Sequence, residues 1–153
     1  MTVSNKLKTA LIGATGYTGL DLIFMLSKHP KIKISNLCAT KNLGKKVSFF
    51  DKRLKGNLPK ISSINKIIWK DLDLIFLSLP NGEAQKIIKK TFSKFKHLKY
   101  IDLSADFRIT NYRIYSNNYK ISHKAKELIK YSIYSISEFN KKILHKYRII
   151  SNP

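Results

Sequence analysis

The sequence predicts an α/β fold, a doubly wound parallel sheet in one domain that spans residues 1–153. Two observations lead to this prediction. First, an apolar run over residues 7–12 is followed by a glycine-rich turn and then by an apolar segment over residues 20–26, which is the order strand, turn, helix. Second, apolar runs typical of buried parallel strands recur over residues 73–79 and 100–104, with a helix-like stripe between them. Strands that alternate with helices favour a parallel sheet with right-handed crossovers.

The turn over residues 13–19 reads GATGYTG, so its glycines follow the spacing G-x-x-G-x-x-G. Glycine lets the backbone turn sharply and approach a pyrophosphate without an intervening Cβ. The helix that begins there offers unpaired N–H groups and a partial positive charge to phosphates. Strand, glycine turn and helix are typical of a Rossmann-like dinucleotide-binding unit. The alternatives are a tight turn without a ligand, and a P-loop, which is disfavoured because no Gly-Lys-Ser/Thr follows.

The residues after the second predicted strand indicate which dinucleotide is bound. His29-Pro30 ends the preceding helix, since the residue before a proline disfavours the helical conformation. Apolar and polar residues then alternate over residues 31–40, which predicts this strand. An NAD-preferring site has Asp or Glu at the end of this strand, to bond the ribose 2′-hydroxyl. Here Thr40 and Lys41 stand instead, and a hydroxyl and an ammonium suit a 2′-phosphate, so we expect NADP (NADPH) as the cofactor. The alternative is that Lys41 is one more solvated lysine. We interpret Cys38, at the strand end, as a packed residue and not a nucleophile.

The middle of the chain combines a weakly patterned segment with a clear strand and helix. Residues 43–66 predict a loop with short irregular pieces, and residues 67–69 predict a short strand. The strand over residues 73–79 ends in a Pro-Asn-Gly turn, and Glu83 suits the positive end of the helix that follows. The apolar stripe of this helix is core, and it consists of Ala84, Ile87, Ile88, Phe92 and Phe95.

The C-terminal third is harder to assign. Residues 110–135 are rich in Tyr, Asn and Ser, with one or two helical turns expected over residues 124–130, and residues 148–151 predict a last strand. Ligands of doubly wound sheets bind at the carboxyl ends of the strands. We therefore expect residues 79–81 and 104–108 to line the same crevice as the glycine turn.

The composition is strongly basic, with 30 Lys and Arg against 9 Asp and Glu and a net charge of +21. Such a charge would suit a protein that binds nucleic acid or an anionic membrane. The lysines fall in every segment, only four residues are arginine, and no aromatic-glycine RNA-binding signature occurs. We therefore expect no nucleic-acid partner, and a charge that draws in an anionic cofactor and a phosphorylated substrate.

Other function classes are disfavoured by what the sequence lacks. No stretch approaches the ~20 apolar residues of a membrane span. The first eight residues have no apolar run behind a basic start, so we expect no signal peptide, no membrane partner and a cytoplasmic location. A single cysteine excludes an internal disulfide framework and a multi-cysteine metal site, and we expect no metal.

Four motifs now occur in order along the chain. They are the glycine turn, Leu-Pro-Asn-Gly at 79–82, Asp-Leu-Ser-Ala-Asp-Phe-Arg at 102–108, and Ser-Asn-Pro at 151–153. Together they resemble the N-terminal half of the N-acetyl-gamma-glutamyl-phosphate reductases, the arginine-pathway relatives of aspartate-semialdehyde dehydrogenase. The resemblance covers essentially the whole chain, and the run over residues 102–108 is its specific part.

The resemblance implies NADPH-dependent reduction of an acyl phosphate to an aldehyde. In this family a cysteine thiolate displaces phosphate to form a thioester, which then accepts hydride, so that one hard step is split in two. That cysteine follows Ser-Asn-Pro by a glycine, and we therefore expect it just after Pro153, together with a second domain that this chain lacks. The resemblance thus implies no catalytic residue within the chain, no activity from the chain alone, a small acyl-phosphate substrate, and a homo-oligomer for the full-length protein.

The resemblance also implies roles for residues of this chain. The residues that would hold the pyrophosphate are Gly13, Thr15, Gly16, Tyr17, Thr18 and Gly19. Thr40 and Lys41 would face the 2′-phosphate, and the nicotinamide side would be met by Leu79, Pro80 and Asn81. The residues that would meet the substrate are Ser104, Arg108 and Asn152. A guanidinium at 108 suits phosphate or carboxylate; its alternative is a structural ion pair with Asp102 or Asp106. The four histidines match no catalytic position, and we interpret them as surface or packing residues.

Two departures from the family pattern stand out. The family usually carries His where Asn81 stands, and Tyr-Gly-Leu-Pro-Glu where this chain has Tyr-Ser-Ile-Ser-Glu over residues 134–138. The loop over these residues is therefore expected to differ in shape. A related aminoadipate-pathway reductase, which acts on a carrier-bound acyl phosphate, fits the same motifs.

Two further hypotheses remain open. One is a non-catalytic NADP-binding sensor like the short-chain dehydrogenases; the catalytic form is excluded because no Tyr has Lys four residues later. The other is a basic nucleic-acid-binding module.

Overall fold

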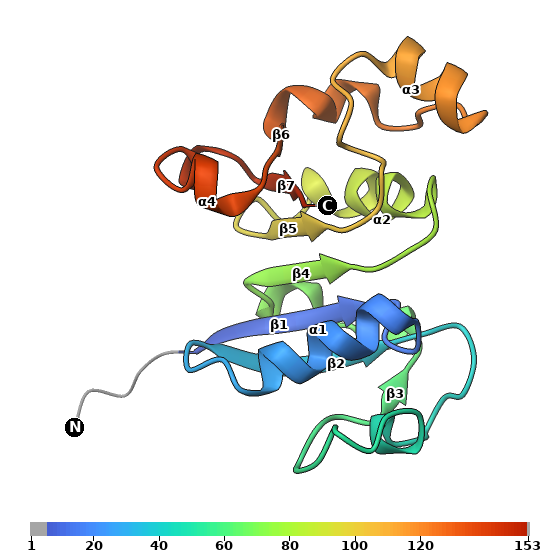
Figure 1. Cartoon of the computed structure of the whole chain (residues 1–153), viewed down its shortest axis with the longest axis vertical. Coiled ribbons are helices and arrows are strands. Elements are labelled where there is room, and N and C mark those ends of the chain that lie inside the picture. Colours follow the sequence, from blue (N-terminus) through green and yellow to red (C-terminus); the bar gives the residue numbers. More distant parts are fainter. Residues whose placement is uncertain (1–5, 153) are drawn as a thin grey trace. The chain divides into compact units, whose positions relative to one another are not determined.

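The computed structural model describes residues 6–152, and the chain forms two compact units, Met1–Ser78 and Leu79–Pro153 (Figure 1). We call them the N-terminal unit and the C-terminal unit, and each is described by itself.

The N-terminal unit is a parallel sheet covered by one long helix. Its strands lie in the order β3-β2-β1-β4, and all neighbours are parallel. They are β1 (Leu7–Ile12), β2 (Ile32–Cys38), β3 (Ile61–Ser62) and β4 (Leu74–Leu77). Helix α1 (Tyr17–Ser27) connects β1 to β2 and lies across these two strands (Figure 1). The predicted strand, turn and helix at the start of the chain are confirmed, as are the strands within residues 31–40 and 73–79.

Burial of consecutive apolar residues accounts for the strand and the helix at the start of the chain. Strand β1 is buried over its last four residues, and Leu11 is fully buried. Helix α1 buries the side of Ile23 and Leu26 against the sheet, while its opposite side is exposed. Burying one such aliphatic side chain contributes about 1.5–3 kcal/mol, so this packing outweighs the helix propensity of single residues.

The loop after β2 holds one prediction that is wrong. Residues 67–69 form no strand; instead a 3-10 turn runs over Trp69–Asp71. The apolar pattern is real, since Ile67 and Leu72 are buried. However, the Ile67 N–H donates to the Ile64 carbonyl within a tight turn and not to a neighbouring strand. Apolar residues therefore mark packing here, not sheet pairing. The predicted loop over residues 43–66 is confirmed apart from the two-residue strand β3 and short 3-10 turns.

The C-terminal unit contains a second set of parallel strands, in the order β5-β7-β6. Its strands are β5 (Lys99–Asp102), β6 (Ser132–Tyr134) and β7 (Ile149–Ser151). Its helices are α2 (Glu83–Phe92), α3 (Tyr112–Tyr119) and the short α4 (Ser137–Asn140), with a 3-10 helix over Lys126–Tyr131. The predicted helix after Glu83 and the predicted strands near residues 100 and 149 are confirmed, and the turns expected over 124–130 are of 3-10 type. The predicted α/β class with parallel strands is confirmed.

Helix α2 packs on β5 through aromatic and hydroxyl contacts. The Phe92 ring stacks against Tyr100, with ring centroids 6.2 Å apart, and the hydroxyls of Thr91 and Tyr100 are 2.9 Å apart. Tyr100 is fully buried, so its hydroxyl needs this partner.

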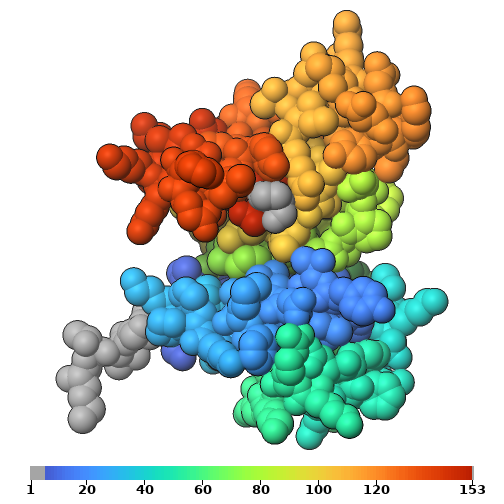
Figure 2. All heavy atoms as spheres, viewed as in Figure 1, coloured from blue at the N-terminus to red at the C-terminus, as the bar shows by residue number. Residues whose placement is uncertain are grey.

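Helix α3 and strand β6 lie in the segment that the sequence left unassigned. The Asn111 side chain caps α3 by accepting from the N–H of Arg113 at 3.0 Å. The helix buries one residue, Tyr115, while most of its other side chains remain accessible. Figure 2 shows this segment, in orange, on the surface of the C-terminal unit.

Candidate functional site

The glycine turn after β1 is shaped by its own packing at two of its three glycines. Gly13 has φ +96°, and a Cβ there would stand 1.9 Å from the Ser78 carbonyl oxygen. A Cβ on Gly19 would stand 2.2 Å from the Gly13 carbonyl oxygen. Both distances are far inside van der Waals contact, so neither position accepts a side chain. These two glycines are therefore required by the fold whether or not a ligand binds.

Gly16 is different. It is exposed, its φ is −77° and ψ 159°, which any residue adopts, and a Cβ there would meet nothing closer than the Gly13 carbonyl at 3.6 Å. Nothing in the described residues demands glycine at this position. A group that approaches the turn from outside would demand it, because a side chain would fill the space that such a group needs. The turn is thus a cradle that a Cβ at Gly16 would fill.

The helix that follows has the electrostatics of an anion site. Gly16 is the N-cap of α1, no side chain caps it, and no acidic residue lies in the first turn. The partial positive charge of the helix start is therefore not neutralised by the described residues of the turn. Tyr17, the first helical residue, is 93% exposed, and Thr18 is also exposed.

The end of β2 lies against this turn. The Cys38 carbonyl accepts from the N–H groups of Gly13, at 2.9 Å, and Ala14, at 3.0 Å. The chain continues directly into Thr40 and Lys41, both exposed. The N-terminal unit therefore brings together the turn and the two residues expected at the 2′-phosphate.

Cys38 itself has the properties of a packed residue, as predicted. It is 1% exposed, and burial raises the pKa of its thiol, although the Ser62 hydroxyl 3.7 Å away opposes that shift. A thiol with a raised pKa is mostly protonated at neutral pH and is a poor nucleophile.

In the C-terminal unit, Asp106 holds two of the predicted site segments together. Its Oδ1 accepts from the Gly82 N–H at 2.7 Å, and its Oδ2 accepts from the Gln85 N–H at 3.1 Å. A carboxylate from 24 residues away thus caps the start of α2, whose N-cap Gly82 has no side chain to do so. The Tyr115 hydroxyl also donates to Oδ1, at 2.6 Å.

The neighbours of Asp106 are buried and fully engaged. Gln85 Nε2 donates to the Tyr115 hydroxyl at 3.0 Å, and the Gln85 Oε1 accepts from the Lys124 N–H. Burial and the Asp106 carboxylate raise the pKa of Tyr115, so it remains a neutral donor. The cluster fixes the geometry of the 102–108 loop, and the partners of Asp106 in it, Gln85 and Tyr115, were not expected from the sequence.

His123 belongs to the same cluster as a packing residue, as predicted. Its Nε2 is 2.8 Å from the Asp106 carbonyl oxygen, and its Nδ1 accepts from the Ala125 N–H at 3.2 Å. These partners assign the proton to Nε2, because a carbonyl can only accept. Burial lowers the pKa of His123, which agrees with a neutral ring.

The segments 79–81 and 104–108 lie side by side, as expected. Asn81 Oδ1 accepts from the Ala105 N–H at 3.1 Å. Ser104 is buried, and its hydroxyl accepts from the Asp106 N–H at 3.2 Å. Leu79 is partly buried and Pro80 is exposed. The expectation that these segments share a crevice with the glycine turn stays a prediction, since the turn belongs to the other unit.

Arg108 forms neither of the ion pairs considered as its structural role. Among residues 6–152, its guanidinium makes one hydrogen bond, from Nη2 to the Leu103 carbonyl at 3.0 Å, and no salt bridge to Asp102 or Asp106. Its Nε is buried without an acceptor among the same residues. A guanidinium has five N–H donors, so most of its capacity to bind an anion is not used by these neighbours.

Asp102 is the most perturbed acid near this loop. It is fully buried at the end of β5, and burial raises its pKa to about 6, although the hydrogen bond from Ser104 opposes the shift. Its Oδ1 accepts from the Ser104 N–H at 2.9 Å, while Oδ2 has no partner among the described residues. A buried carboxyl with a raised pKa exists partly as the neutral acid near pH 6.

Asn152 lies beside Asp102 at the carboxyl edge of the strands. Its N–H donates to the Asp102 carbonyl at 2.8 Å, and the Ser137 hydroxyl is 3.5 Å from its Oδ1. The predicted substrate residues Ser104, Arg108 and Asn152 therefore all follow the carboxyl ends of β5 and β7, where ligands of parallel sheets bind. Pro153 lies outside the described residues.

Within residues 6–152, no three His, Cys, Asp or Glu side chains are grouped as metal ligands would be. In the same range, no helix has both the length and the apolar character needed to cross a membrane.

The chain is similar in sequence to a known protein family. A family model described as semialdehyde dehydrogenase, NAD binding domain, matches residues 8–147. N-acetyl-gamma-glutamyl-phosphate reductase from Brachyspira hyodysenteriae is 40% identical over 96% of this chain and 43% of the relative. The enzyme of that name from Ehrlichia ruminantium is 37% identical over 99% of this chain and 43% of the relative. The chain thus spans less than half the length of these relatives.

Solved structures share the fold. Aspartate semialdehyde dehydrogenase II from Vibrio cholerae superposes with a TM-score of 0.65 at 14% identity, over 97% of this chain and 38% of that one. Aspartate semialdehyde dehydrogenase from Candida albicans, solved with NADP, gives a TM-score of 0.58 at 18% identity, over 95% of this chain and 42% of that one. At these identities the likeness concerns the fold alone.

Proposed function

Because the chain belongs to the family of semialdehyde dehydrogenase NAD-binding domains, we propose that it is the NADPH-binding part of an N-acetyl-gamma-glutamyl-phosphate reductase. Relatives of that name, 37–40% identical, align with nearly the whole chain. The sequence motifs at residues 79–82 and 102–108 support the same assignment.

The observation that carries the cofactor part of this proposal is the contrast between Gly16 and its neighbours. Gly13 and Gly19 are required by backbone packing, whereas Gly16 faces open space and has an ordinary conformation. A pyrophosphate seated on the uncapped start of α1 explains a glycine at this position. Gly13, Thr15, Gly16, Tyr17, Thr18 and Gly19 would hold it.

Preference for NADPH follows from the residues after β2. Thr40 and Lys41 are exposed beside the turn, and no acid accompanies them between residues 38 and 46. A ribose 2′-phosphate would gain a charged hydrogen bond from Lys41, whereas an unmodified ribose would lack the acid that an NAD site offers.

On the substrate side, the residues of this chain would bind and orient. NADPH, when bound, supplies hydride to the reaction. Arg108 would hold the phosphate or carboxylate of the substrate through parallel N–H donors. Asn152 and Ser104 would donate to the acyl phosphate, and donors fixed in advance act most strongly where charge develops. Asp106, through Gly82, Gln85 and Tyr115, keeps this loop in place.

The nucleophile of the proposed reaction lies outside this chain. Cys38 is excluded by its burial and its raised pKa. We propose that the thiolate is supplied by a cysteine that follows Pro153 by one glycine, as the resemblance implies.

The reductase assay tests the proposal on the full-length protein that contains this chain. NADPH oxidation is followed with N-acetyl-gamma-glutamyl phosphate, and separately with a carrier-bound aminoadipyl phosphate. The expected result is turnover of the first substrate only. Turnover of the second alone would move the protein to the aminoadipate pathway, and turnover of neither would contradict the proposal.

A further inference from the structure

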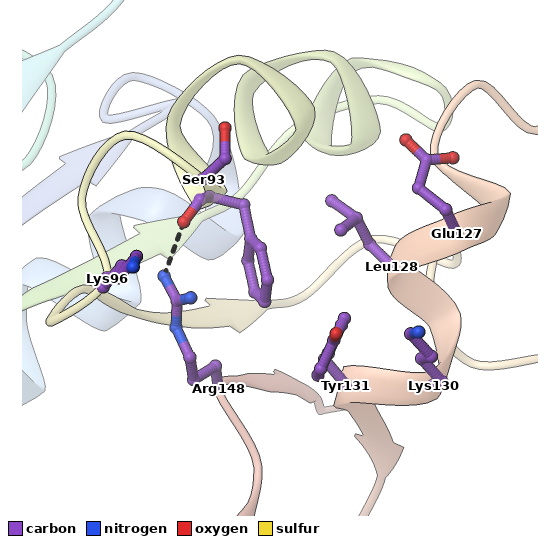
Figure 3. A pocket seen from close by; sticks show the side chains of 8 residues that line it. Ser93, Lys96, Glu127, Leu128, Lys130, Tyr131 and Arg148 are labelled. Atoms are coloured by element: carbon purple, nitrogen blue, oxygen red, sulfur yellow. Dashed lines mark hydrogen bonds between the residues drawn. The ribbon is translucent and has the colours of Figure 1, made fainter.

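A groove in the C-terminal unit lies away from the loops discussed above. It occupies about 500 Å³ between the end of α2, the 3-10 helix over residues 126–131 and the start of β7 (Figure 3). Arg148, which lines the groove, directly precedes β7, and its Nε donates to the carbonyl of Leu98, the residue before β5. The groove therefore lies at the amino ends of these strands, whereas Ser104, Arg108 and Asn152 follow their carboxyl ends. It is a different site from the one proposed for the substrate.

The walls of the groove are aromatic and aliphatic. The rings of Phe92 and Tyr131 are 5.2 Å apart and inclined by 38°, and Leu128 lies beside them (Figure 3). Tyr131 is 42% exposed, so one ring is accessible from solvent, while Phe92, which also lines the groove, is only 8% exposed. A volume of this size with mainly apolar walls is typical of sites for small organic molecules.

Arg148 makes the groove rigid and removes a source of repulsion for anions. Its guanidinium stacks 3.7 Å from the Phe92 ring centre. It also donates to the carbonyls of Phe92, Phe95 and Leu98 at 3.0, 2.9 and 3.1 Å. The carbonyls at a helix C-terminus carry partial negative charge, and here Arg148 binds the carbonyl of Phe92, the last residue of α2. Part of the negative charge at this helix end is therefore balanced by the guanidinium.

The rim of the groove carries positive charge. Lys96 and Lys130 line it, and neither forms an ion pair within residues 6–152. The Lys130 ammonium lies 5.1 Å from the Tyr131 ring centre, which puts a cation directly beside the accessible ring. The one acid of the lining, Glu127, already pairs with Lys89 at 3.3 Å. The charge of the rim is thus complementary to an anion.

We propose that this groove binds a small amphipathic anion, with a flat aromatic body against Tyr131 and Leu128 and a carboxylate that faces the lysines of the rim, Lys96 and Lys130, which line opposite sides of the groove (Figure 3). A nucleic acid would need several exposed ring faces for base stacking, and the groove offers one. A neutral aromatic would leave both ammonium groups unpaired.

The test uses 2-naphthoate as the probe, with 2-naphthylmethanol as the neutral analogue, in saturation-transfer NMR and calorimetry on the protein saturated with NADPH. A ligand of this size should bind with a Kd of ~1 mM or below. The alcohol should bind at least about threefold more weakly. Equal binding of the two compounds, or no saturation transfer at 2 mM, overturns the proposal.

Three variants test whether the probe binds in this groove. Ser93→Tyr fills the groove from an exposed lining position and should abolish binding, with circular dichroism confirming the fold. The double variant Lys96→Gln, Lys130→Gln should weaken naphthoate about three- to tenfold and flatten its salt dependence, while the alcohol is unaffected. Lys90→Gln changes an exposed lysine of α2 outside the lining and should leave Kd unchanged. Naphthoate binding that survives in folded Ser93→Tyr, or that Lys90→Gln weakens as much as the rim variant does, shows diffuse binding to lysines and overturns the proposal.

Discussion

Replacement of Gly16 by valine separates cofactor binding from folding. The position is exposed, its backbone is extended, and the nearest atom to a new Cβ is the Gly13 carbonyl oxygen at 3.6 Å, an ordinary contact. Valine is a poorer N-cap than glycine, so the cost in unfolding free energy should be about 0.5–1 kcal/mol. In a chain of this length that corresponds to a fall in Tm of roughly 1–4 °C.

The effect on NADPH should be much larger. Three carbon atoms would occupy the space where a pyrophosphate meets the start of α1. Loss of one or two hydrogen bonds to a charged group removes about 3 kcal/mol, which raises Kd about 100-fold. The assay is a titration of NADPH followed by its fluorescence, with urea unfolding of the same sample to measure stability.

Two other glycine variants serve as controls. Gly13→Ala places a Cβ 1.9 Å from the Ser78 carbonyl, so we expect it to lose more than about 3 kcal/mol of stability. Gly56→Ala has open space around it but a φ of +93°, so it should cost about 1 kcal/mol through backbone strain and leave NADPH binding unchanged. If folded Gly16→Val binds NADPH as tightly as the wild type, the reasoning about the turn is wrong.

Four further experiments, three with variants and one with a thiol reagent, test other parts of the account. Lys41→Glu should weaken NADPH about tenfold more than NADH in parallel titrations, and equal losses would contradict its role at the 2′-phosphate. Cys38 should resist iodoacetamide at pH 8 until urea unfolds the protein; rapid labelling of the folded protein would refute its description as a buried, protonated thiol. Asp106→Ala removes the acceptor of two N–H groups and of the Tyr115 hydroxyl. The free energy of unfolding, measured in urea, should fall by about 3–5 kcal/mol, and by less in Asp106→Asn. Asp102 has a pKa of about 6 in the folded protein, above the value of about 3.9 in the unfolded chain. Its protonated form therefore stabilises the fold, and this contribution of roughly 3 kcal/mol is lost as the pH rises from about 4 to about 6. Asp102→Asn should remove that pH dependence, and identical pH profiles for both proteins would show that Asp102 titrates normally.

The first half of the fold could be predicted because its signals are local. The apolar run of β1, the glycine turn and α1 follow one another without interruption, and each is buried as its pattern requires. Strand β4 was equally clear, since three of its four residues are buried. In such elements the residues that become buried lie close together in the sequence, so their pattern can be recognised there.

Elements held by distant contacts could not be predicted. Helix α3 has the sequence YRIYSNNY, which is poor in strong helix formers. It depends on the Asn111 cap and on burial of Tyr115, whose hydroxyl accepts from Gln85, 30 residues earlier in the chain. Strand β6 has only three residues, and its pairing with β7 involves a strand 17 residues later. The wrong strand at residues 67–69 has the opposite cause, since Ile67 packs in the core without pairing to a strand and Ile68 is exposed.

The candidate site shows the same division. The glycine turn and the segments 79–81 and 104–108 were recognised from motifs, and the structure brings the latter two together through Asn81 and Ala105. The buried cluster around Asp106 was missed, because Gln85 and Tyr115 appear in the sequence as ordinary helix positions. One signal was available: a glycine N-cap at residue 82 has no side chain with which to cap its own helix, so a carboxylate from another segment was a candidate for that place.

Calorimetric titration of NADPH and NADH into the protein tests the central claim most directly, namely that the cradle at Gly16 and the residues after β2 form an NADPH site. We expect one site per chain, with NADPH bound at least about tenfold more tightly than NADH, as one charged hydrogen bond to the 2′-phosphate requires. Absence of binding by both nucleotides, or equal affinity for the two, would contradict the account.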